Sequence, residues 1–96
     1  MGNRASVSFK NGDNKSVAVF HHWGGEEFHA QAEAFAKSFR VKYPAGGGDP
    51  FSRREPNVVL VQFIQSLEKD DYSIYLGKDQ NDGDNSDAGH LTVNLI

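Results

Sequence analysis

The first part of the chain contains two stretches in which apolar and polar residues alternate, the period-two pattern of a β-strand. Arg4–Lys10 alternates along its whole length, which predicts a strand with one buried side. Ser16–His22 is apolar on both sides as far as Phe20, which is typical of a strand inside a sheet. Asn and Gly at positions 11 and 12 favour the positive φ values of a tight turn. Together these features predict an antiparallel hairpin.

The hydrophobic period changes after the glycines at positions 24 and 25. Within residues 26–43, apolar side chains recur every three or four positions at Phe28, Ala32, Phe35 and Phe39. This spacing predicts an amphipathic helix. Glutamates in its first turn and basic residues near its last turn suit the helix dipole. Pro44 and the glycines that follow it are expected to end the helix.

The uncharged segment Asn57–Leu67 fits either a helix or a strand, because a short apolar run does not separate the two. Leu60, Phe63 and Leu67 have helical spacing, whereas the valines at positions 58, 59 and 61 suit a strand. The length of the run and the proline before it favour a helix. A helix with so little polar surface is either covered on two sides or forms a contact between subunits. Helix 57–67 is therefore a candidate homo-oligomer interface.

The last third of the chain contains two more alternating stretches, Tyr72–Gly77 and Leu91–Ile96, which most simply form a second hairpin. The element order is then ββααββ. We predict an α+β fold, a two-layer sandwich in which a four-stranded, mainly antiparallel sheet carries two helices on one face. At 96 residues, the whole chain (1–96) is expected to form a single α+β domain.

Composition narrows the classes of function. The chain has no cysteine, which excludes disulfides and thiolate metal sites within it and fits a reducing compartment. No apolar run reaches the roughly 18 residues of a membrane span, so we expect a cytoplasmic protein with no membrane contact. The net charge is -3, and Lys78–His90 accounts for all of it with one lysine and four aspartates. This balance argues against nucleic acid as a partner, because a nucleic-acid surface needs an excess of Lys and Arg.

The acidic loop, residues 78–90, is the most distinctive stretch of the chain. Its aspartates are Asp79, Asp82, Asp84 and Asp87. Alternating Asp and Asn side chains supply the oxygens that Ca²⁺ or another divalent cation needs. The spacing is not that of an EF-hand, because the glycine and glutamate of that pattern are missing. The same residues are also turn formers, so the loop is a cation site, a contact for a basic protein partner, or a solvated bend.

The histidines form a second candidate that overlaps with the loop. His22 ends the second predicted strand and His90 opens the last one, so a suitable strand order brings both toward the loop aspartates. Glu26 and His29 are three residues apart on one helical face, a spacing found in some metal sites. Imidazoles and carboxylates drawn from His22, Glu26, His90 and the loop would suit Zn²⁺, Fe²⁺ or Mn²⁺ and could activate water.

The sequence therefore favours a small non-catalytic binding domain whose acidic loop is the contact or divalent-cation site. It contains no nucleophile elbow and no phosphate-binding glycine motif that would indicate an enzyme. The alternative hypothesis is a metal-dependent hydrolase that uses the His/Glu/Asp cluster.

Overall fold

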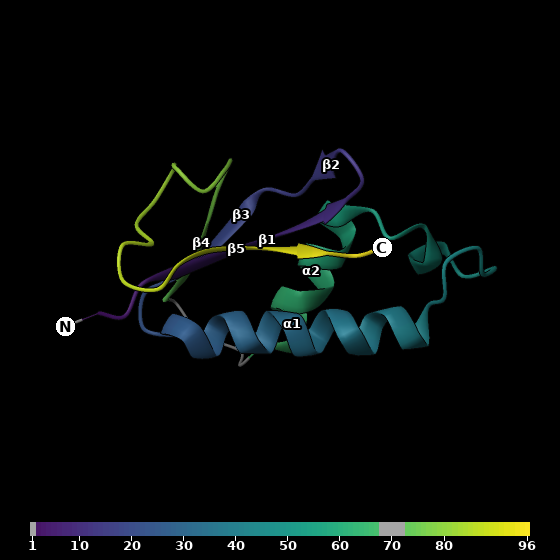
Figure 1. Ribbon diagram of the computed structural model, residues 1–96, viewed down its shortest axis with the longest axis horizontal. Helices are drawn as coiled ribbons and strands as arrows, with labels where there is room; N and C mark the ends of the chain where they lie inside the picture. Colours follow the sequence, from purple (N-terminus) through teal and green to yellow (C-terminus); the bar gives the residue numbers. More distant parts are fainter. Residues whose placement is uncertain (1, 68–72) are drawn as a thin grey trace.

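The computed structural model describes residues 2–67 and 73–96, and these residues form an α+β fold (Figure 1). Neither α-helix in these ranges is long and apolar enough to cross a membrane. The elements are β1 (Ala5–Asn11), β2 (Asn14–Lys15), β3 (Ala18–His21), α1 (Gly25–Lys42), the short 3-10 helix η1 (Pro50–Arg53), α2 (Pro56–Ser66), β4 (Ile74–Gly77) and β5 (Gly89–Asn94). Both predicted helices are confirmed, and the ambiguous apolar run is the helix α2.

The sheet is built around β1, which has neighbours on both sides. β3 pairs antiparallel with β1 on one side, and β5 pairs with β1 in parallel along the other side. β4 pairs antiparallel with β3, and the short β2 pairs with the end of β1. The strand order across the sheet is therefore β5-β1-β3-β4. β2 lies on the same side of β1 as β3, because Lys10 pairs with β2 and with β5 on opposite sides. Three of the four pairings among the described residues are antiparallel, as predicted.

The predicted second hairpin is wrong, because its two strands lie at opposite edges of the sheet. β4 borders β3 and β5 borders β1, so β4 and β5 run in the same direction with two strands between them. Parallel strands cannot be joined by a tight turn and need a crossover connection of about a dozen residues. The acidic loop is that crossover. Of the predicted strand 72–77, Tyr72 lies outside the described residues.

Only Ala18–His21 of the predicted strand Ser16–His22 forms a strand, β3, and the short β2 precedes it at Asn14–Lys15, which is why the sheet has five strands where four were expected. The Ser16 hydroxyl accepts the N–H of Phe9 at 2.9 Å, a bond that would otherwise go to a backbone carbonyl of the partner strand. The N–H of Val17 donates to the Asn57 side-chain carbonyl of α2 at 3.0 Å. The break between β2 and β3 therefore ties the sheet to the first turn of α2.

Both α-helices cover the same face of the sheet, as predicted. Alternate residues of β1 and Val19 of β3 form one buried cluster with apolar residues from α1 and α2. Phe63 of α2 is central to this cluster, since its ring packs on three other phenylalanines. The opposite side of α2 is open to solvent, where Val58 and Val61 are 37% and 49% exposed. α2 is thus buried on one side, and its valine face remains a predicted subunit contact.

The acidic loop covers one end of the second face of the sheet. In Figure 1 the loop lies on the side of the sheet away from α1. Ser6, Ser8 and Phe20 point to this face, because they alternate with the residues that face the helices, and all three are at most 1% exposed. Gly83 lies directly over Phe20: a Cβ at this position would be 2.9 Å from the Phe20 ring and from the Tyr75 ring. The absence of a side chain at Gly83 therefore allows the loop to pack on the sheet.

Arg54 connects three segments that are distant in the sequence. Its guanidinium donates to the carbonyl oxygens of Arg40 and Tyr43 at the end of α1 and to that of Leu95 after β5, at 2.7–3.4 Å. A cation at the last turn of a helix also interacts favourably with the negative end of the helix dipole. Arg54 holds a left-handed backbone conformation with φ of 52°, an uncommon state for a residue with a side chain. Its hydrogen bonds offset that strain.

Arg54→Lys should lower the free energy of unfolding by about 1–3 kcal/mol, because a lysine keeps the charge but cannot form the planar set of bonds. Urea unfolding followed by circular dichroism measures this. The control is Arg53→Lys at the neighbouring exposed position, which should stay within about 0.5 kcal/mol of the wild type. Equal effects of the two variants would contradict the role given to Arg54.

Candidate functional site

The carboxylates of the acidic loop bind backbone groups of the loop itself. Three aspartates each accept a hydrogen bond from an N–H no more than four residues away. The pairs are Asp79 with Asn81, Asp82 with Lys78, and Asp84 with Ser86, at 2.9–3.0 Å. Side-chain bonds of this kind stabilise turns. They give the aspartates a structural role that requires no ligand, and the loop's role as a contact or cation site stays a prediction.

Arg4 fastens the far end of the loop to the start of β1. Its side chain forms an ion pair with Asp84 at 3.2 Å and a longer one with Asp87 at 3.9 Å. The backbone N–H of Arg4 also donates to Asp87 at 2.9 Å. The hydroxyl and the N–H of Ser86, followed by the charge of Arg4, hold the pKa of Asp84 below its ordinary value. One cation thus offsets part of the repulsion among the loop carboxylates.

His90 lies between two serines on the face of the sheet beneath the loop. Its Nδ1 is 2.6 Å from the Ser6 hydroxyl and its Nε2 is 2.9 Å from the Ser8 hydroxyl. Asn85 of the loop donates to the same Ser6 hydroxyl at 2.8 Å and to the Gln80 carbonyl at 3.1 Å. Burial, and then the charges of Lys15 and His29, lower the pKa of His90 to about 4. Because both serines are almost completely buried, the cluster secures the loop and offers no accessible nucleophile.

The other predicted metal-site residues have separate environments. The ring of His22 packs edge-on against Trp23, and Glu26 is exposed in the first turn of α1. His29 has its Nε2 at 3.0 Å from the Gly89 carbonyl and 3.2 Å from the Ser6 carbonyl. Among residues 2–67 and 73–96, no group of three His, Cys, Asp or Glu side chains could hold a metal ion. The hydrolase hypothesis therefore has no structural support in this part of the chain.

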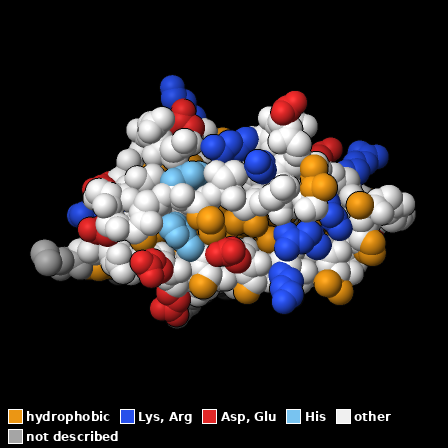
Figure 2. Space-filling view, viewed as in Figure 1, with side chains coloured by type: hydrophobic (Ala, Val, Ile, Leu, Met, Phe, Trp, Pro, Cys, Tyr) orange, Lys and Arg blue, Asp and Glu red, His pale blue; other side chains and the backbone are white. Residues whose placement is uncertain are grey.

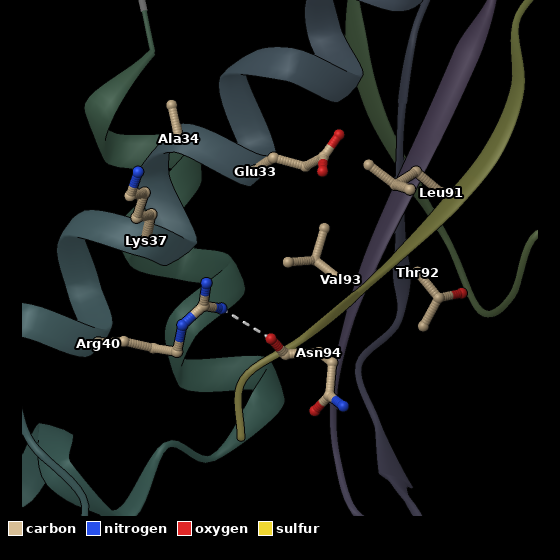
Figure 3. A pocket seen from close by; sticks show the side chains of 8 residues that line it. All are labelled: Glu33, Ala34, Lys37, Arg40, Leu91, Thr92, Val93 and Asn94. Atoms are coloured by element: carbon tan, nitrogen blue, oxygen red, sulfur yellow. Dashed lines mark hydrogen bonds between the residues drawn. The ribbon is translucent and has the colours of Figure 1, made fainter.

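A groove of about 380 Å³ lies on another side of the molecule, between the outer edge of β5 and α1 (Figure 3). Its floor is apolar, whereas Glu33 stands toward one end and Lys37 and Arg40 toward the other. Figure 2 shows this face, with acidic side chains over the first half of α1 and basic ones over the second half. The lining residues are Glu33, Ala34, Lys37, Arg40, Leu91, Thr92, Val93 and Asn94.

The outer edge of β5 is open along this groove. In a parallel pair, the backbone groups of alternate residues point to the neighbouring strand and those of the residues between point away. The N–H of Leu95 donates to the carbonyl oxygen of Lys10 in β1 at 2.9 Å, so every second residue of β5 counted from Leu95 faces β1. The backbone groups of the residues between them point outward; these are His90, Thr92 and Asn94. The Asn94 carbonyl confirms this direction, because it accepts a bond from Arg40 at 2.8 Å. Within the described residues, β1 is the sole strand paired with β5.

The sequence-based reasoning did not identify this groove. It assigned Lys37 and Arg40 to the helix dipole and placed β5 in a hairpin with β4, where its edge would have been occupied. One signal was present: the loop before β5 is far longer than a tight hairpin turn and long enough for a crossover. The position of α1 beside β5 depends on tertiary packing.

Comparison with protein-family models, curated proteins and solved structures found no match to this chain.

Asn85→Ala should lower the free energy of unfolding by about 1–3 kcal/mol, because it removes two hydrogen bonds and leaves polar groups beneath the loop unpaired. Asn81→Ala is the matched control, since Asn81 lies in the same loop and is exposed. It should change the stability by less than about 0.5 kcal/mol. If chemical denaturation gave both variants the wild-type midpoint, the loop would not be fastened through Asn85.

His90 should make the fold less stable as the pH falls from about 6.5 toward about 4. In this window the unfolded chain binds a proton at position 90 that the folded chain does not, and below about pH 4 both forms bind it. The loss should be about 1–3 kcal/mol, and it should be smaller in His90→Asn. Urea unfolding at a series of pH values measures it, and an NMR titration of the imidazole gives its pKa. A ring that titrates near pH 6.5 would contradict this prediction.

Proposed function

We propose that this chain is a non-catalytic binding module that takes up an extended peptide segment as an additional strand beside β5. The observation that supports this most directly is the open edge of β5, where the backbone groups of Thr92 point outward and Thr92 lines a groove. Strand addition to an exposed sheet edge is a common mode of peptide recognition, in which backbone hydrogen bonds supply affinity and side-chain pockets supply specificity.

The groove has the features that such a site needs. Val93 is 7% exposed and Leu91 is half-buried, so apolar surface lies beneath the edge without forming a large exposed patch. Glu33 and Lys37 are exposed on α1 and place opposite charges at different positions along the length of the groove. These charges would select a bound strand by its own charge pattern and set its direction.

The groove is better suited to recognition than the acidic loop. All four loop carboxylates already accept hydrogen bonds from backbone N–H groups, three from within the loop and one, Asp87, from Arg4. The Arg4 side chain also forms ion pairs with Asp84 and Asp87. A ligand at the loop would have to compete with these bonds. The outward N–H and carbonyl of Thr92 have no such competitor among the neighbouring strands of the described sheet.

Thr92→Pro should abolish strand addition and keep the fold, because proline removes an outward N–H and is tolerated on edge strands. Random linear peptides displayed on phage are selected on the wild type and tested on both proteins. Selected peptides should bind Thr92→Pro at least about tenfold more weakly, the equivalent of one or two hydrogen bonds. Circular dichroism checks that the variant is folded.

The control places the same substitution on the other edge strand, as Leu76→Pro. Leu76 is 58% exposed and belongs to β4, on the far side of the sheet from β5. If this variant folds, it should bind the peptides as the wild type does. Peptides that bind wild type and Thr92→Pro equally, or a monomeric wild type that selects no peptide, would rule out the β5 groove as a peptide site.

A further inference from the structure

We infer that the strand that occupies the groove is β5 of a second copy of this chain, so that two sheets join into one across a twofold axis through Thr92. This inference rests on the proposed function and names its partner. An isologous contact requires a surface that is complementary to itself. The edge of β5 and the charges of α1 meet this requirement.

The backbone of β5 is suited to pairing with its own copy. His90, Thr92 and Asn94 point outward and are evenly spaced about Thr92. In an antiparallel pair centred on Thr92, that residue faces its own copy and His90 faces Asn94 of the partner. All three outward residues of the edge then lie opposite another outward residue, which is the register in which antiparallel strands exchange hydrogen bonds.

The charges of α1 support the same axis. α1 runs alongside β5 in the same direction, with His29 beside Gly89 and Arg40 beside Asn94. The groove spans roughly 10 Å along both elements, from Glu33 to Arg40 on the helix and from Leu91 to Asn94 on the strand. A twofold rotation about Thr92 therefore reverses the helix and brings Glu33 of one copy to the level of Lys37 of the other.

Charge complementarity extends along the helix. α1 carries Glu26 and Glu27 in its first turn and Arg40 and Lys42 in its last. Two such helices side by side in opposite directions place the acidic half of each against the basic half of the other. A parallel arrangement would place like charges together, so the charge pattern selects the antiparallel pair. This pattern makes a second copy the preferred occupant over an unrelated strand.

The test is a reciprocal charge exchange between Glu33→Lys and Lys37→Glu. Both positions are exposed, so neither substitution disturbs the core. In a dimer of either variant, position 33 of one copy meets a like charge at position 37 of the other. In the mixed dimer, both contacts are of opposite sign. Sedimentation equilibrium from micromolar to millimolar concentration measures the dissociation constant of the wild type, each variant and the equimolar mixture.

We expect a wild-type dimer, at least about tenfold weaker association of each variant alone, and association of the mixture to within about threefold of the wild type. Asp13→Lys makes the same change of charge at an exposed position outside α1 and β5, in the turn between β1 and β2, and should associate as the wild type does. Thr92→Pro should be monomeric. The Thr92 amide should also exchange its hydrogen more slowly as the protein concentration rises, which the amides already bonded to β1 should not do.

Three results would overturn the twofold contact. The first is a monomeric wild type at every concentration. The second is a dimer that both charge variants and Thr92→Pro leave intact. The third is a dimer that is lost in Val61→Glu and kept in Thr92→Pro, because it would place the contact on the exposed face of α2. A monomer that still binds selected peptides through Thr92 would remove the second copy as partner and leave the proposed function standing.

Discussion

The parallel pairing of β5 with β1 is the constraint on which the rest of the structure depends. It places β5 at the edge opposite β4, so the chain has to cross the sheet between the two strands. That crossing buries Ser6, Ser8 and Phe20, which would otherwise lie on an open face. It also leaves β5 with a free edge beside α1. The acidic loop on one face of the sheet and the groove beside β5 are therefore both consequences of the parallel pairing of β5 with β1.

The acidic loop illustrates how a composition typical of a ligand site can serve the fold. A connection that crosses a sheet has no strand partners, so its backbone groups need bonds from side chains. Asp and Asn supply such bonds within a few residues, and Gly83 allows close approach to the sheet. Repulsion among the carboxylates is reduced where Arg4 binds two of them. The enrichment in aspartate therefore has a sufficient physical reason in the crossing itself.

His90 links this cover to the sheet. Its ring is bonded on both sides by serines of β1, and Asn85 of the loop shares one of those hydroxyls. The backbone of the same residue belongs to the open edge of β5. The acidic loop and the edge of β5 are therefore connected through His90. A change in the packing of the loop would alter the position of the edge that is proposed for recognition.

Much of the local structure follows from the sequence by itself, because it depends on neighbouring residues. The period of Phe28 to Phe39 and the proline that opens α2 are sufficient for the two helices, and alternation with Asn-Gly is sufficient for the first hairpin. Strand order, the parallel register of β5 and the groove beside α1 were decided by tertiary structure. Side-chain alternation is the same for a hairpin and for a crossover, so it carries no information about which strand becomes the neighbour. That choice depends on contacts between residues more than eighty positions apart, such as Ser6 with His90, which no local pattern encodes.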